Sequence, residues 1–122
     1  MLNRWRLAVN VAIIEQEIAD AVSRFHREQQ GHAPAEVHAF VMEDMVVVRC
    51  AKVFTPTEQD LAQSDEGKKA IQSARREQRA LTRREIEADV SAVVEKRILR
   101  SFYDLDVRTA DAIEVYILDS AL

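Results

Sequence analysis

The stretch EVHAFVMEDMVVVRCAKVF, residues 36–54, decides the fold of this chain. Two runs rich in β-branched and aromatic residues flank Glu43 and Asp44, which is the pattern of a β-hairpin. If these two residues form the loop, Val37 lies opposite Cys50 and all clean apolar positions share one face. A shift of one residue would destroy this separation. The alternation therefore predicts an antiparallel hairpin in this register.

The two faces of the predicted hairpin differ in composition. The wholly apolar face consists of Val37, Ala39, Val41, Val46, Val48 and Cys50. The other face consists of His38, Phe40, Met42, Met45, Val47 and Arg49. Because the second face is also largely apolar, we expect both faces to be covered, by a helix or by another subunit.

A helix is predicted before the hairpin, over about residues 4–30. Apolar side chains recur at steps of four, four and three from Ile14 to Phe25, and Gly31 suits a left-handed helix end. At the start, Trp5 stands between two arginines. This start fits an amphipathic packing helix, contact with a membrane surface, or a disordered segment.

Two helices and a second hairpin are predicted after the first hairpin. The sequence TPTE at 55–58 combines a capping threonine, a proline and a glutamate that can complete a capping box. Ser64 can cap a long helix running from Asp65 into the low 90s. Two further β-rich runs surround a turn near 109–111. The sequence thus predicts an α+β fold, an antiparallel sheet of two hairpins with the N-terminal and long helices packed on it, in the order α-β-β-α-α-β-β.

This order places residues 13–122 in a single domain, preceded by a helical extension over residues 1–12. Within the long helix the apolar residues change phase. The first stripe consists of Ile71, Ala74, Gln78 and Leu81, and the second of Ile86, Val90, Val93 and Val94. Either the helix bends near Thr82, or its two halves contact different partners.

Composition bounds the class of protein. The chain has 122 residues, 48% of them hydrophobic, and a net charge of -4, which argues against a general nucleic-acid binder. No apolar run approaches the roughly 18–20 residues that cross a bilayer. The single cysteine, Cys50, excludes an internal disulfide and fits a reducing cytosol, so we expect a cytoplasmic protein.

No motif for catalysis is present, so we predict neither enzyme activity nor a cofactor. The chain has three histidines, His26, His32 and His38, and none has the i, i+4 spacing of a helical zinc pair. We therefore predict no metal site, and Cys50 on the apolar face is expected to be inert. Asp104 and Asp106 could converge on a cation, but solvated positions at a strand end are the ordinary interpretation.

The sharpest local feature is a basic stripe on the long helix. It consists of Lys68, Arg75, Arg76, Arg79 and Arg83. Arg75, Arg76 and Arg79 have no carboxylate three or four residues away, the spacing of helical ion pairs. The stripe can be a solvated face, a contact with an acidic surface of this fold or of a partner, or an anion or nucleic-acid site. The absence of interleaved aromatic residues disfavours nucleic acid.

Residues 13–119 resemble the MpsC-like family of small bacterial domains. The matching motifs are a P-x-x-V strand at 34–37, the hairpin EDMVVVR at 43–49, FTPTEQDLA at 54–62 and Gly67-Lys68. Two departures are a Glu-Asp pair where the family often has two aspartates, and a late YDLDVRTADAIE stretch that lacks the family's glycine. The resemblance implies a soluble accessory or regulatory component of a sodium-translocating, membrane-potential-generating system linked to inorganic carbon uptake. It carries over no catalytic residue.

These observations favour a non-catalytic interaction protein that acts beside a membrane cation or bicarbonate transport complex. The alternative is a nucleic-acid- or anion-binding regulator that uses the basic stripe. We also expect a homodimer, because two apolar surfaces would otherwise remain in water. The expected interface consists of Phe40, Met42, Met45, Val47, Ile86, Val90 and Val94.

Overall fold

The computed structural model describes residues 4–122, with side chains from residue 10 onward. The predicted element order is confirmed. The elements are α1 (Arg4–Gln30), β1 (Glu36–Met42), β2 (Met45–Ala51), α2 (Pro56–Leu61), α3 (Asp65–Val94), β3 (Ile98–Asp106) and β4 (Asp111–Leu118). The expectation about Trp5 falls on a side chain outside the described part of the chain.

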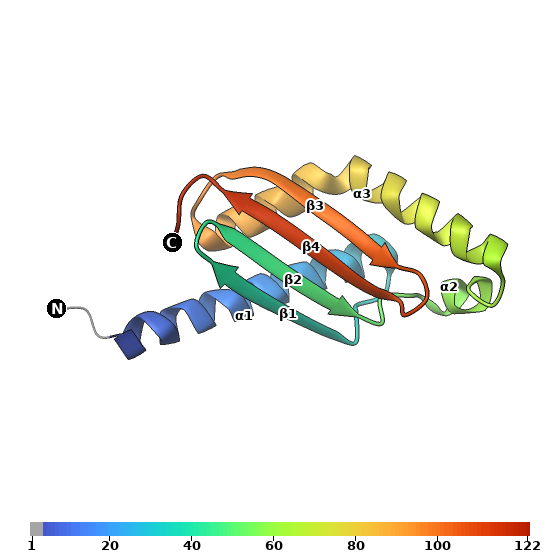
Figure 1. Cartoon of the computed structure of the whole chain (residues 1–122), viewed down its shortest axis with the longest axis horizontal. Helices are drawn as coiled ribbons and strands as arrows, with labels where there is room; N and C mark the ends of the chain where they lie inside the picture. Colours follow the sequence, from blue (N-terminus) through green and yellow to red (C-terminus); the bar gives the residue numbers. More distant parts are fainter. Residues whose placement is uncertain (1–3) are drawn as a thin grey trace.

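The four strands form one antiparallel sheet in the order β1-β2-β4-β3. Helices α1 and α3 cover one face of this sheet, and the first turns of α1 extend beyond the edge of the sheet (Figure 1). The first hairpin has the predicted register, with Val37 opposite Cys50 and a turn at Glu43 and Asp44. The second hairpin turns between Asp106 and Asp111.

The predicted helix caps are also present. Thr55 and Glu58 form a reciprocal capping box at the start of α2. Ser64 accepts a hydrogen bond from the Gly67 amide at the start of α3, and Gly31 has a φ of 69° after α1. These local signals locate the helix ends because each satisfies backbone groups that the helix leaves without partners.

The hydrophobic core lies between the helices and the inner face of the sheet. The inner face carries Val46, Val48, Cys50, Ala112, Tyr116 and Leu118. Helix α1 contributes Ile18, Val22 and Phe25, and α3 contributes Ile71, Ile86, Val90 and Val94.

The predicted phase change along α3 is wrong. Ile86, Val90 and Val94 lie in the core of the single chain, so they are not an exposed interface stripe. Leu81, expected to pack, is instead 80% exposed. One continuous inward line runs through positions 71, 75, 79, 82, 86, 90 and 94, at steps of three or four. Arg75 and Arg79 occupy the middle of this line. Because arginine is not apolar, hydrophobic periodicity does not reveal that these two positions face inward.

The outer face of the sheet is uncovered in the single chain. Phe40 is 50% exposed and Phe102 is 56% exposed, and Met42 is also exposed. Met45 and Val47 are half-buried by their neighbours in the sheet. The predicted apolar character of this face is thus confirmed, whereas no element of the described chain covers it.

The described part of the chain contains the helices α1, α2 and α3. None of them combines the length and the apolar composition needed to cross a bilayer.

Candidate functional site

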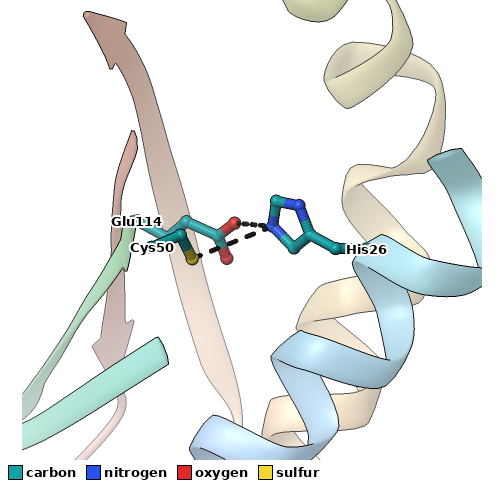
Figure 2. Close-up of side chains that lie close together, drawn as sticks. All are labelled: His26, Cys50 and Glu114. Carbon is teal, nitrogen blue, oxygen red and sulfur yellow. Dashed lines mark hydrogen bonds and ion pairs between the residues drawn. The ribbon is translucent and has the colours of Figure 1, made fainter. Parts of the chain in front are cut away.

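A cluster of polar side chains lies on the inner face of the sheet. Glu114 projects from β4 and is fully buried, and His26 reaches it from α1 (Figure 2). His26 Nε2 lies 2.8 Å from Glu114 Oε2. Because an ionised carboxylate only accepts hydrogen bonds, Nε2 is the protonated nitrogen. The Tyr116 hydroxyl donates to the other carboxylate oxygen.

Helix α3 adds a positive charge to this cluster. Arg79 Nη2 donates to Glu114 Oε2 over 2.6 Å. Its guanidinium lies 4.4 Å from the Tyr103 ring centre and 5.6 Å from that of Phe25. Both distances are within the range of cation–π contacts. Arg79 is therefore paired with a carboxylate and also lies against two aromatic rings.

These contacts determine the ionisation of Glu114. Burial alone would raise its pKa, because a dry environment disfavours the charged form. The Arg79 charge and the His26 hydrogen bond outweigh burial and lower the Glu114 pKa to about 2. Burial and the neighbouring Glu114 charge raise the pKa of Tyr116, so its hydroxyl stays a donor. Glu114 and Arg79 thus form an ionised, charge-balanced pair inside the core.

Cys50 completes the cluster without becoming reactive. Its sulfur lies 3.9 Å from His26 Nε2. Burial, followed by the Glu114 charge, strongly raises the pKa of the thiol. A thiol is a poor nucleophile because the thiolate is the reactive form. The predicted inert packing role of Cys50 agrees with this environment.

The same residues have the atom types of a metal site. One ligand atom each from His26, Cys50 and Glu114 lies within 4.8 Å of the others. Such a set suits zinc in principle. However, Arg79 places a fixed positive charge on the same carboxylate oxygen that a cation would need. The cluster is therefore better explained as a structural network than as a metal centre.

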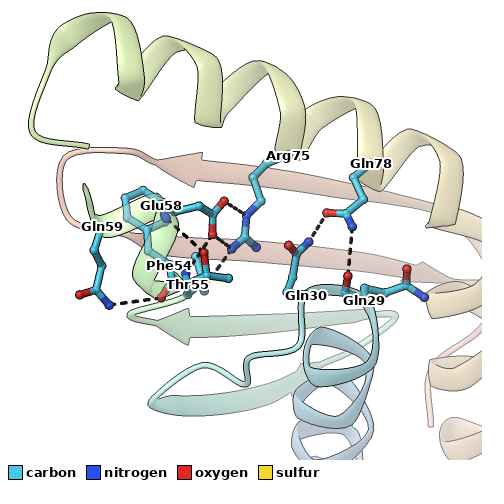
Figure 3. A network of polar contacts seen from close by, with 9 residues as sticks. Gln29, Gln30, Phe54, Thr55, Glu58, Gln59, Arg75 and Gln78 are labelled. Carbon is cyan, nitrogen blue, oxygen red and sulfur yellow. Dashed lines mark hydrogen bonds and ion pairs between the residues drawn. The ribbon is translucent and has the colours of Figure 1, made fainter. Parts of the chain in front are cut away.

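A second buried ion pair joins α2 to α3. Arg75, only 4% exposed, donates from Nε and Nη2 to the Glu58 carboxylate at 2.8 and 2.5 Å (Figure 3). Its Nη2 also donates to the Val53 carbonyl at 2.8 Å. Burial would raise the Glu58 pKa, but hydrogen bonds from Arg75 and Thr55 lower it. The capping glutamate of α2 is thus also the partner of a core arginine.

A small polar cavity separates the two ion pairs. It has a volume of about 20 Å³ and is lined by Arg75, Gln78, Arg79 and Tyr103, among others. Gln30 donates a hydrogen bond to Gln78 beside it (Figure 3). A cavity of this size admits about one water molecule. It is too small for an organic substrate.

The structure divides the predicted basic stripe. Arg75 and Arg79 point toward the core and pair with Glu58 and Glu114, which are distant in the sequence, so the five residues do not form one exposed surface. Arg76 is exposed, Lys68 is half-buried, and Arg83 lies 3.9 Å from Glu87. One predicted alternative, contact with an acidic surface of the same fold, describes Arg75 and Arg79.

Other predicted site residues remain apart from the cluster. His32 and His38 lie outside the core, and His38 pairs loosely with Glu36. Asp104 is exposed on β3, and Asp106 accepts from the Arg108 amide at the turn. Sequence reasoning missed Glu114. The signal was present, since Glu114 occupies an inward position in the alternating strand DAIEVYIL.

Comparison with known proteins finds a matching family model and a curated relative. A family model described as "Na+-translocating membrane potential-generating system (MpsC)" matches residues 11–120. The chain is also 28% identical over 106 residues to "Uncharacterized protein YbcI" of Bacillus subtilis (strain 168). This match covers 84% of this chain and 83% of the relative. No solved structure matches the chain.

Proposed function

The chain belongs to the MpsC family, and from this premise we propose that it is a non-catalytic accessory protein of a sodium-translocating membrane system. It acts from the cytoplasm, as a homodimer, through contacts with other proteins. The observation that carries the homodimer is the uncovered apolar face of the sheet, and the exposed arginines of α3 carry the contact with the membrane partner. In soluble proteins, a large exposed apolar patch usually marks an interaction site.

The buried polar cluster supports binding rather than catalysis. A catalytic group must reach its substrate. Glu114, His26 and Arg79 instead face one another, and the cavity beside Arg79 admits only a water-sized molecule. A wider, open recess of about 390 Å³ lies beside Arg75 and Glu58, and none of the three residues of the cluster lines it. Within the chain, Glu58 neutralises the charge of Arg75, and Glu114 neutralises that of Arg79. We assign the cluster the role of holding α1 and α3 on the sheet.

The remainder of the basic stripe provides a second contact surface. Arg76 and Arg83 are exposed on α3, and Lys68 is half-buried near the start of the same helix. We assign these three residues to contact with an acidic surface of the membrane partner. They are too few, in a chain of net charge -4, to make nucleic acid the favoured ligand.

A pull-down tests this proposal. The tagged chain is mixed with native membranes dissolved in mild detergent, and the membrane proteins that it retains are identified. We expect a cation-translocating membrane subunit to be recovered, and recovery to fall in the double variant R76E/R83E. The matched control is E77Q/E85Q, which changes two exposed charges on the same helix and should retain the partner. Absence of any membrane protein at every salt concentration would contradict the proposal.

The nucleic-acid alternative has its own signature. Binding through phosphate contacts weakens steeply as salt rises, because counterions are released. We expect no electrophoretic shift of duplex DNA or single-stranded RNA even at low salt. A shift that is lost in R76E/R83E would favour the alternative instead.

A further inference from the structure

We propose that a second copy of this chain covers the outer face of the sheet, with the two-fold axis running across the strands along one row of side chains. The row consists of Phe40, Val47, Val115 and Phe102. This inference rests on the homodimer of the proposed function and adds the surface, the symmetry and the charge pairs that hold it.

The strand registers define the row. Phe40 lies opposite Val47 on β2, Val47 lies opposite Val115 on β4, and Val115 lies opposite Phe102 on β3. All four side chains point away from the helices. The row therefore forms an apolar band across the full width of the sheet, with its two most exposed residues on the two edge strands.

One further row flanks the band on each side. The first consists of Met42, Met45, Ile117 and Arg100, and the second of His38, Arg49, Ile113 and Asp104. Across the three rows only Arg100, His38, Arg49 and Asp104 are polar. The centre is apolar and the charges lie near the rim, which is the arrangement of a protein interface.

The face is large enough for a specific dimer. Four strands about 4.8 Å apart, each of about seven residues rising roughly 3.3 Å, give a flat area of about 450 Å². A face-to-face pair then hides about 900 Å² before the relief of the side chains is counted. This flat value is already close to the roughly 1,000 Å² expected of a biological interface, and the relief of the side chains adds to it.

Two charges on this face lack an ion pair within the described part of the chain. Arg49 lies 3.5 Å from Asp111, and His38 lies 3.5 Å from Glu36. Arg100 and Asp104, by contrast, appear in no ion pair among the described residues. They stand on the same strand, one on each side of Phe102, and have opposite charges.

The proposed two-fold axis brings these two charges together. Rotation about the central row places Phe102 over its own counterpart and exchanges the two flanking rows. Arg100 of each copy then faces Asp104 of the other, so the dimer contains this pair twice. Stacked sheets lie about 10 Å apart, a distance that arginine and aspartate side chains span together.

A two-fold axis along the strands is the competing geometry. It exchanges β1 with β3, so that Asp104 faces His38 and Arg100 faces Met42. His38 would then be shared between Asp104 and Glu36, and Arg100 would lie on an apolar side chain without a carboxylate. The axis across the strands satisfies both unpaired charges and is therefore the one we propose.

A charge exchange tests the geometry. The variants are R100D, D104R and the double R100D/D104R, measured by sedimentation equilibrium, with R84D on α3 as a control that matches the charge change of R100D. Each single variant places like charges opposite each other at both contacts, which weakens association by about tenfold or more. The double variant restores the pairing, and we expect its dissociation constant to return to within a few-fold of the unmodified protein.

Each outcome decides the proposal. Restoration in the double variant, with R84D unchanged, supports the axis across the strands. Weak association in the double variant overturns that axis. Association that is weakened by H38E and restored in H38E/D104K supports the axis along the strands, because only that axis brings His38 and Asp104 together. A monomer at all concentrations overturns the dimer altogether. Recovery of a membrane subunit by that monomer would leave the accessory role standing, so the two failures are distinguishable.

Discussion

The guanidinium of Arg79 lies 2.6 Å from the carboxylate of Glu114, inside the core and 35 residues away in the sequence. This contact ties the middle of α3 to the centre of the sheet. His26 donates to the same oxygen from α1, so one carboxylate holds both helices. Such a network favours one helix arrangement over others, because any shift leaves a buried charge without its partner.

Arg79→Met is expected to lower the free energy of unfolding by about 3–5 kcal/mol, since it leaves Glu114 buried without its counter-charge. The control is Arg83→Met, which breaks an exposed pair with Glu87 and should cost at most about 1 kcal/mol. Urea denaturation followed by circular dichroism measures both. The double variant R79M/E114Q should be more stable than R79M alone. Equal losses for Arg79→Met and Arg83→Met would refute the structural role of the pair.

The stability of the protein is expected to fall in acid. The folded pKa of Glu114 is about 2, below its ordinary value of 4.5, so its contribution is complete above the ordinary value and is lost as pH falls toward 2. The size of this contribution is on the order of 3 kcal/mol. Glu58, whose pKa is also lowered, acts in the same direction. Unfolding in urea at pH 7 and pH 3 gives the difference. The free energy of unfolding of R79M/E114Q should fall less between pH 7 and pH 3 than that of the unmodified protein. An equal fall in the two proteins would show that Glu114 does not cause the loss of stability in acid.

Gly67→Ala is expected to disrupt the junction of α2 and α3. A Cβ at this position would lie 1.7 Å from the Leu61 carbonyl oxygen, which is backbone and cannot move alone. We expect a loss of about 3 kcal/mol, the upper part of the range for overpacking. Gly31→Ala is the matched control. It meets no atom within 4 Å and carries only left-handed strain, about 1 kcal/mol. A loss for Gly67→Ala no larger than for Gly31→Ala would contradict the packing of this junction.

Much of the fold could be predicted from local signals. The hairpin register follows from the alternation in residues 36–51, because one slip would place polar residues on the core face. The start of α2 follows from Thr55, Pro56 and Glu58, whose capping geometry is complete within four residues. These elements depend on neighbours in the sequence, and a sequence pattern records such neighbours directly.

The polar core could not be predicted in the same way. Helical spacing tests only partners three or four residues away, whereas Arg75 pairs across 17 residues and Arg79 across 35. Since these arginines are not apolar, the apolar residues alone indicate a stripe ending at Leu81 and a change of phase before Ile86. Glu114 was the available signal, since an acid among inward-facing apolar residues of a strand requires a buried partner.

Phe40→Asp is expected to weaken self-association, because it places a charge in the central apolar row of the outer sheet face, on the edge strand β1. The change leaves the core intact, since Phe40 is already 50% exposed in the single chain. We expect this variant to be a monomer, or to aggregate through the apolar residues of the sheet face that remain exposed. The control is Leu81→Asp, which introduces the same charge at an even more exposed apolar residue on α3 and should leave the dimer unchanged. Equal behaviour of the two variants in sedimentation would show that the sheet face is not the interface.

The central claim is that the outer face of the sheet is an interface, and the molar mass of the unmodified protein in solution tests it most directly. Light scattering coupled to gel filtration should give twice the 13.9 kDa mass of the chain, and the same value on dilution until the dimer dissociates. A stable particle of 13.9 kDa at every concentration would contradict the claim.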